Sequence, residues 1–330
     1  MWTPWRRRRS EAPGAESAPA SPAALPQASA WLQRLEWTVM KRLHGQLQGD
    51  FRSLFRGTGL DLADLREYQP HDDVRHIDWN VTARLQVPHV REHHEDRELA
   101  AWFLVDLSGS VQFGSGPTSK RELALQATAV LAALLSRQGN RVGLILHTGA
   151  GPRAQVIVPP RTGRTHLLQM LHRLQHTPPA GATQHSDLAS WLRQAQSLLR
   201  QPAMLLVVSD FIAPDGWQQP LSELSRRHEL LALRLQDVVE QQLPAAGLVW
   251  LQDAETGEQM LLDLGDRALR ERFAAQALAR DEALTQSLQR AGADHLTLRT
   301  DEAVDRALLR LVQRRRRTAR QAMHQGRVHA

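Results

Sequence analysis

The chain reads AWFLVDLSGS from Ala101 to Ser110, and these ten residues predict both the centre of the fold and a candidate site. Its first five residues form an apolar run that predicts a buried strand, and the polar residues after it predict a loop at the strand's end. Alternate residues of an extended segment face one side, so Asp106, Ser108 and Ser110 can present oxygen atoms to a single point. Such oxygens suit Mg2+, although an Asp- and Ser-rich turn without a metal explains this pentapeptide equally well.

A second buried-strand pattern, Met204–Ser209, is followed by the acidic residue Asp210. Thr183 lies between the two strands in sequence, in a loop before a helical stretch. Ligands of open α/β sheets bind outside the carboxyl ends of the strands. We therefore expect one metal site that binds Mg2+, with Mn2+ as an alternative, and its predicted ligands are Asp106, Ser108, Ser110, Thr183 and Asp210.

The rest of the pattern alternates strands with helices. Such alternation predicts a largely parallel sheet with helices on both faces. Two apolar runs, 248–251 and 260–264, flank a Gly-containing loop and predict a β-hairpin. The other predicted strands are 101–107, 141–147, 155–158, 204–209, 230–235 and 295–298, and the predicted helices are 119–137, 165–174, 187–199, 217–226, 266–289 and 302–312.

Two features resemble known families. The order Asp-x-Ser-x-Ser, loop Thr and strand-end Asp resembles the metal-ion-dependent adhesion site (MIDAS) of von Willebrand factor A domains. The segment from Gly57 to Arg84 is similar to the signature of the DUF58 family, with His71 where the family usually has Gly. The resemblance covers about residues 50–313. It implies a doubly wound, mostly parallel sheet of the von Willebrand factor A (Rossmann-like) type, with an inserted β-hairpin and an N-terminal extension.

The resemblance also implies a function. The hydroxyls of Ser108, Ser110 and Thr183 would bind the ion directly, Asp106 and Asp210 would act largely through water, and one coordination position would stay open for a partner's carboxylate. Because such proteins are commonly paired with MoxR-type AAA+ ATPases, we expect a noncatalytic, Mg2+-dependent adaptor in the assembly, maturation or stress handling of client proteins. The alternative is a metal-dependent hydrolase of phosphoester-type substrates, which needs an activated water and a general base or second metal ion.

Other catalytic patterns are weaker. Residues 114–120 lie where a phosphate-binding loop would lie, but Ser119 replaces the glycine required before Lys120, so we expect no ATP binding. A serine nucleophile would need a histidine base, and His147 and His185 are candidates by position alone. We predict no catalytic residue and no organic cofactor. A second metal site could be imagined in the acidic and histidine cluster of the signature segment, but its spacing matches neither a zinc hydrolase nor a calcium loop, so turns and salt bridges explain it more simply. The cluster consists of His71, Asp72, Asp73, His76 and Asp78.

Composition sets further limits. The 330 residues are 42% hydrophobic and include no cysteine, which excludes disulfides and thiolate metal sites and fits a cytoplasmic protein. No apolar run reaches the roughly 18 to 20 residues of a membrane-spanning helix. The formal net charge of +6 comes almost wholly from arginine, because Lys41 and Lys120 are the only lysines. No sequence-specific nucleic-acid module is recognisable.

The predicted organisation has four parts. Residues 1–30 form a disordered, basic and Ala/Pro-rich tail, 31–100 an N-terminal helix and the signature segment, 101–313 the von Willebrand factor A-like domain, and 314–330 a basic C-terminal tail. Within the second part, Trp31–Leu47 has helical spacing, and Trp79 is expected in the core.

Overall fold

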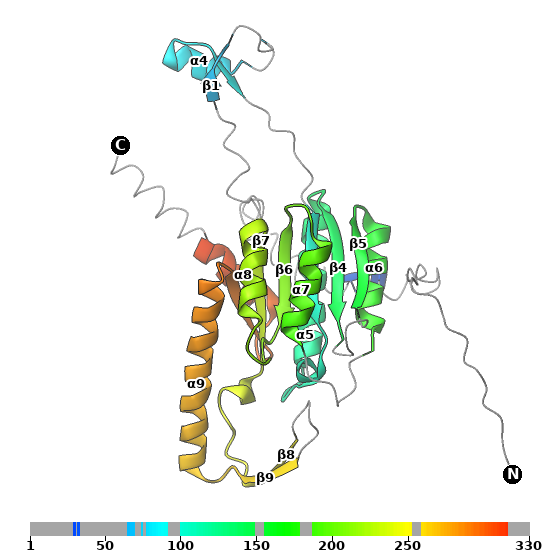
Figure 1. Cartoon of the computed structure of the whole chain (residues 1–330), viewed down its shortest axis with the longest axis vertical. Helices are drawn as coiled ribbons and strands as arrows, with labels where there is room; N and C mark the ends of the chain where they lie inside the picture. The colour runs from blue at the N-terminus through cyan, green and yellow to red at the C-terminus, as the bar shows by residue number, and fades with distance from the viewer. Residues whose placement is uncertain are drawn as a thin grey trace, which may run out of the picture.

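A six-stranded sheet forms the centre of the protein (Figure 1). The computed structural model describes residues 29–30, 32–33, 65–69, 74, 77–91, 100–148, 155–178, 187–252 and 259–315. The strand order is β10-β7-β6-β3-β4-β5, so the predicted α/β fold with a mostly parallel sheet is confirmed. The strands are β3 (Ala100–Asp106), β4 (Arg141–His147), β5 (Gln155–Arg161), β6 (Met204–Ser209), β7 (Glu229–Gln236) and β10 (Asp294–Arg299).

The edge strand β5 departs from the parallel pattern and pairs antiparallel with β4. Only residues 148–154 separate the two strands. A parallel pair needs a crossover connection of about a dozen residues or more, so a link this short leaves only the antiparallel pairing.

Helices cover both faces of the sheet. One face packs on α5 (Lys120–Arg137), α6 (Arg164–His176) and the helical residues 304–315. The other packs on α7 (Leu188–Leu198), α8 (Gln218–Arg227) and the last turns of α9 (Arg267–Arg290), and α7 and α8 lie in front of the sheet in Figure 1.

The alternation of β3 shows why the apolar run becomes a central strand. Phe103 and Val105 enter the core on the α5 face, whereas Leu104 enters the core on the α7 face, and all three are fully buried. Each such burial stabilises the fold by about 1.5 to 3 kcal/mol. A strand buried on both faces fits only the interior of the sheet, between β6 and β4, and this places Asp106 at the centre of the sheet's carboxyl edge.

The predicted apolar runs after β7 form a separate two-stranded sheet. β8 (Leu248–Gln252) and β9 (Gln259–Asp263) pair antiparallel, with Trp250 opposite Leu261. The loop between them lies outside the described residues. Both Trp250 and Leu261 are exposed, as are Leu248 and Met260.

The described N-terminal part contains β1 (Leu65–Glu67), α4 (Trp79–Leu85) and β2 (His89–Arg91). The prediction that Trp79 belongs to the core is wrong, because its exposed fraction is 69%. Three-residue strands and a seven-residue helix offer little surface under which an indole can be buried. Most of the predicted helix Trp31–Leu47 and much of the signature segment, including His71, lie outside the described residues. So do the predicted tails, except for residues 29–30 and 314–315, which are helical.

Among the helices of the described ranges, none combines the length and the apolar character needed to cross a membrane. The predicted domain boundaries and the cytoplasmic location stay predictions.

Gly143 allows β4 to lie close to its neighbours. A Cβ atom at this position would lie 3.0 Å from the Pro160 nitrogen, the Val158 oxygen and Trp102 Cε3. Two of these atoms belong to backbone that cannot move without disturbing the β4–β5 pairing. We expect Gly143→Ala to lower the free energy of unfolding by about 1 to 3 kcal/mol in a urea titration. Gly116→Ala, with no heavy atom within 4 Å of the new Cβ, is the matched control and should change it by less than about 0.5 kcal/mol.

Candidate metal site

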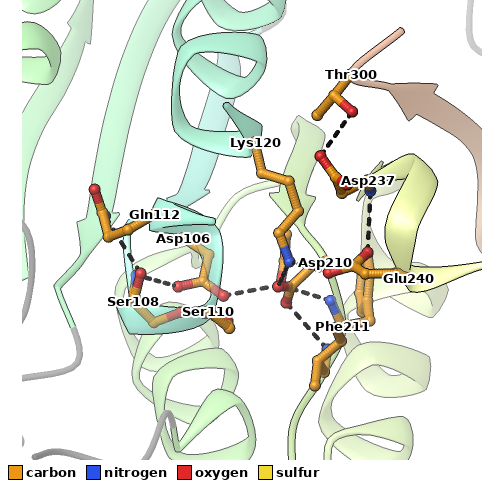
Figure 2. A network of polar contacts seen from close by, with 12 residues as sticks. Asp106, Ser108, Ser110, Gln112, Lys120, Asp210, Phe211, Asp237, Glu240 and Thr300 are labelled. Carbon is orange, nitrogen blue, oxygen red and sulfur yellow. Dashed lines mark hydrogen bonds and ion pairs between the residues drawn. The ribbon is translucent and has the colours of Figure 1, made fainter. Parts of the chain in front are cut away.

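The candidate site lies where two neighbouring parallel strands end (Figure 2). Asp106 is the last residue of β3, and Asp210 directly follows β6. Ser108 and Ser110 come from the short 3-10 helix η4 (Gly109–Gln112) and its N-cap. The structure therefore brings together four of the five predicted residues. The fifth, Thr183, lies outside the described residues.

Asp106 is a buried carboxylate with hydrogen-bond donors on both oxygens. Its Oδ1 accepts from the Ser108 N–H at 2.9 Å, and its Oδ2 accepts from the Ser209 hydroxyl at 2.8 Å. Only 2% of the residue is exposed. Burial raises the pKa of Asp106 and the neighbouring Asp210 carboxylate raises it further, whereas His147 and the Ser108 hydrogen bonds act in the opposite direction. The net rise indicates a negative charge with too little local compensation.

The hydroxyls of Ser108 and Ser110 lie side by side. Their Oγ atoms are 3.3 Å apart, and both residues are buried. Two neighbouring ligands of an octahedral Mg2+, each about 2.1 Å from the ion, lie about 3.0 Å from one another. The serine pair therefore fits the spacing of two direct ligands after a small adjustment.

Asp210 is held in place from two sides. Its Oδ1 accepts from the Ile212 N–H at 3.1 Å, and its Oδ2 accepts from Lys120 Nζ at 2.7 Å. The chain turns sharply after it, because Phe211 has a φ of 56°, a left-handed conformation that is unusual for a bulky residue. Strained backbone of this kind concentrates at functional sites.

Lys120 was missed as a member of the site. Its Nζ also donates to Glu240 Oε1 at 2.6 Å, and only 1% of the lysine is exposed. Burial lowers the pKa of Lys120, but the carboxylates of Asp210 and Glu240 raise it by more, so the ammonium stays charged. The composition offered one signal that could have pointed to Lys120, because only two of the chain's 41 lysines and arginines are lysines.

A second polar cluster lies next to Lys120 and was also missed. Asp237 directly follows β7 and is fully buried. It accepts hydrogen bonds from both the N–H (3.0 Å) and the hydroxyl of Ser115. It also accepts from the Val239 N–H at 3.0 Å and from the Thr300 hydroxyl at 2.9 Å. Burial raises the pKa of Asp237, but these hydrogen bonds lower it by more. The Asp237 N–H donates in turn to Glu240 Oε2, which closes a capping box on η5 (Val238–Glu240). Ser115 and Lys120, both from the loop that resembled a phosphate loop, are thus engaged by carboxylates.

His147 ends β4 beside Asp106 and stacks on Trp191, with ring centroids 5.1 Å apart. Its buried Nε2 has no hydrogen-bond partner among the described residues, so this nitrogen is not paired with either serine. Burial lowers the pKa of His147, although Asp106 and Asp187 act in the opposite direction. The other candidate base, His185, lies outside the described residues. In the part of the chain that the structure describes, no three His, Cys, Asp or Glu side chains form a metal-binding group, so a metal here must rely on hydroxyl oxygens.

This arrangement fits a hard divalent cation. It offers two neutral hydroxyls side by side, one buried carboxylate that lacks a counter-charge, and a second carboxylate held by a lysine. Hydroxyl, carboxylate and water oxygens are the ligands that Mg2+ and Mn2+ prefer. Ser108, Ser110 and the two carboxylates are the described residues that would hold such an ion.

The fold and this strand-end site define an α/β protein with a polar centre at the carboxyl edge of its sheet. The chain belongs to the family described as "Protein of unknown function DUF58", whose model matches residues 64–283. The predicted membership of the DUF58 family is thereby confirmed.

Curated relatives come from mycobacteria. Uncharacterized proteins of Mycobacterium tuberculosis and Mycobacterium bovis are 41% identical over 294 residues, which cover 89% of this chain and 92% of each relative. An uncharacterized protein of Mycobacterium avium is 37% identical over 162 residues, which cover 49% of this chain and 95% of the relative.

Among solved structures, the chain is similar to the conserved hypothetical protein BatB from Bacteroides thetaiotaomicron, with a TM-score of 0.42 and 13% identity. It is also similar to an aerotolerance-related membrane protein from Bacteroides fragilis, with a TM-score of 0.42 and 14% identity. In both comparisons the alignment covers 66% of this chain and 99% of the other. Neither the identity nor the TM-score supports a functional comparison.

The raised pKa of Asp106 leads to a stability prediction. An acid whose pKa is raised by folding destabilises the folded state while it is ionised, and this cost disappears as the pH falls through the raised pKa. Asp106→Asn should therefore raise the free energy of unfolding of the metal-free protein at pH 7, by about 1 kcal/mol. The advantage over the wild type should shrink as the pH falls. Urea titrations in EDTA across this range measure both effects.

Asp215→Asn is the matched control for this experiment, because Asp215 is an exposed residue with the same chemistry. It should leave the free energy of unfolding unchanged at both ends of the pH range. A loss of stability in Asp106→Asn at pH 7 would show that the hydrogen bonds from Ser108 and Ser209 outweigh the cost of the buried charge.

Proposed function

We propose that this protein is a noncatalytic, Mg2+-dependent protein-interaction adaptor with a metal site of the von Willebrand factor A (MIDAS) type. The observation that carries the proposal is the pair of serine hydroxyls, 3.3 Å apart, next to two buried carboxylates whose oxygens already accept hydrogen bonds. Ser108, Ser110 and Thr183 are the direct ligands, Asp106 and Asp210 act largely through water, and Mn2+ can replace Mg2+. A bound ion would supply positive charge for a carboxylate of the partner.

The charge of the site supports a partner of this kind. The direct ligands are neutral, so the ion's charge is only partly offset by the carboxylates behind them. A client that offers an Asp or Glu would gain a charge-assisted contact in a buried setting. The proposed second partner, a MoxR-type AAA+ ATPase, rests on the DUF58 resemblance alone. It would supply the mechanical work of client assembly, maturation or stress handling in the cytoplasm.

The alternative, a metal-dependent hydrolase of phosphoesters, has less support. Hydrolysis needs a general base within reach of the attacking water. Asp106 and Asp210 accept hydrogen bonds on both oxygens, and the pKa of the nearby His147 is lowered by burial behind Trp191. Each of these three candidate bases is therefore either hydrogen-bonded on both oxygens or buried against Trp191, and we favour binding over catalysis.

Metal binding should stabilise the wild-type protein. An ion that binds only the folded state adds about 2.7 kcal/mol to the free energy of unfolding at one hundred times its dissociation constant. We expect Mg2+ to raise the melting temperature of the wild type and to have no effect on the Ser108→Ala/Ser110→Ala variant. Ser197→Ala, which changes a serine on the exposed side of α7, should respond like the wild type.

A pull-down from native cell extract tests the adaptor role. With Mg2+ present, the wild type should recover an AAA+ ATPase, and EDTA or the double serine variant should abolish the recovery. Recovery of the same ATPase without metal or serines would exclude a metal-bridged interaction. Metal-dependent turnover of a generic phosphoester that is lost in Asp106→Ala would instead establish the hydrolase.

A further inference from the structure

Lys120 is a buried lysine that bridges two carboxylates beside the candidate metal site. It is the first residue of α5, and its ammonium lies between the carboxylates of Asp210 and Glu240, at 2.7 Å and 2.6 Å (Figure 2). The side chains of Lys120 and Asp210 are each 1% exposed, whereas that of Glu240 is 25% exposed. The contact with Asp210 is thus the fully buried half of this bridge.

We propose that Lys120 is a positioning residue that keeps Asp210 from binding the ion directly, so that a coordination position stays open for the partner's carboxylate. This inference rests on the proposed metal site. In this proposal, Lys120 determines whether Asp210 binds the ion directly or through water.

The hydrogen bonds of Asp210 hold its carboxylate in its present orientation. Its Oδ2 is engaged by Lys120, and its Oδ1 by the Ile212 N–H. To bind an ion directly, Asp210 would have to turn an oxygen away from one of these donors. Turning away from Lys120 would leave the buried ammonium with Glu240 as its one remaining anionic partner among the described residues. Breaking one side of a buried ion pair is strongly unfavourable. Asp210 therefore stays where it is.

Asp106 and Asp210 differ in the charge of the groups that donate to them. Both donors to Asp106 are neutral, the Ser108 N–H and the Ser209 hydroxyl. Among the described residues, no lysine or arginine ammonium or guanidinium is paired with Asp106, whereas the charge of Asp210 is paired with the Lys120 ammonium. The cation is therefore attracted mainly towards Asp106 and the serines next to it, and Asp210 contributes at longer range.

The shape of the lysine ammonium suits this position better than a guanidinium would. All but two of the 41 basic residues in this chain are arginines, yet the buried position 120 is a lysine. An ammonium is a compact point charge that can lie between two carboxylates from different elements, whereas a guanidinium is a rigid planar fork. Lys120 thus meets one oxygen of Asp210 and leaves the other to the Ile212 N–H.

Lys120→Met in the full chain tests the proposal, with Mn2+ as the probe in place of Mg2+. Free Mn2+ measured by electron paramagnetic resonance gives the affinity, and water proton relaxation gives the number of waters on the bound ion. Without the ammonium, Asp210 should turn to the ion and displace about one water from its octahedral shell. The affinity for Mn2+ should also rise about tenfold or more, because a positive charge near the ion is removed.

Arg121→Met is the matched control, since it removes a positive charge one residue further along the same helix, where the guanidinium donates to the Thr177 carbonyl. It should leave the number of bound waters unchanged. If Lys120→Met binds Mn2+ with the same number of waters as the wild type, Lys120 does not position Asp210 and the proposal is wrong, whatever the change in affinity.

Asp210→Asn decides the question if Lys120→Met does not fold. With Lys120 in place, Asp210 should reach the ion only through water, so this variant should weaken Mn2+ binding but keep the same number of bound waters. A gain of about one water would show that Asp210 binds directly despite Lys120 and would overturn the inference. If instead the wild type binds no Mn2+, or Ser108→Ala/Ser110→Ala binds it equally well, the proposed metal site itself is wrong.

Discussion

Two carboxylates lie buried at the ends of adjacent strands, and the rest of the site depends on how their repulsion is offset. Asp106 and Asp210 are each 2% exposed, and the strands that carry them, β3 and β6, are hydrogen-bonded neighbours in the middle of the sheet. Burial of like charges is costly unless donors or cations surround them. In the protein alone, the donors and the cation that offset this cost are the Ser108 and Ile212 amides, the Ser209 hydroxyl and Lys120. A divalent cation would complete it.

The same constraint explains the loop between β3 and α5. Residues 114–120 lie where a phosphate-binding loop would lie, and two of them, Ser115 and Lys120, are directed to carboxylates of the protein itself. Ser115 binds Asp237 and Lys120 binds Asp210 and Glu240, so the loop ties the ends of β6 and β7 to the start of α5. Ser115 and Lys120 therefore hold the strand ends of β6 and β7 in place.

The strand and helix pattern could be predicted from the sequence because the apolar runs of a parallel sheet are long and continuous. The convergence of Asp106, Ser108, Ser110 and Asp210 followed from the rule that strand ends of such a sheet meet at one edge. The clustering of Lys120 and Asp237 with Asp210, Thr300 and Ser115 could not be predicted, because these contacts join residues 63 to 122 positions apart and no periodicity links them. Trp79 was assigned to the core from its apolar character, yet its small local unit does not cover it. Whether Thr183 joins the site stays a prediction.

A site with neutral direct ligands has a consequence for regulation. Hydroxyl ligands bind Mg2+ more weakly than carboxylates do, so the free energy of ion binding would depend on the partner's carboxylate as well as on this chain. By thermodynamic linkage, the factor by which the ion raises the affinity for the partner equals the factor by which the partner raises the affinity for the ion. In the proposed site, holding Asp210 away from the ion would lower the affinity of the free protein for the ion and would increase this mutual dependence. A buried lysine beside a strand-end aspartate would thus make the coordination of the ion complete only when the partner is bound.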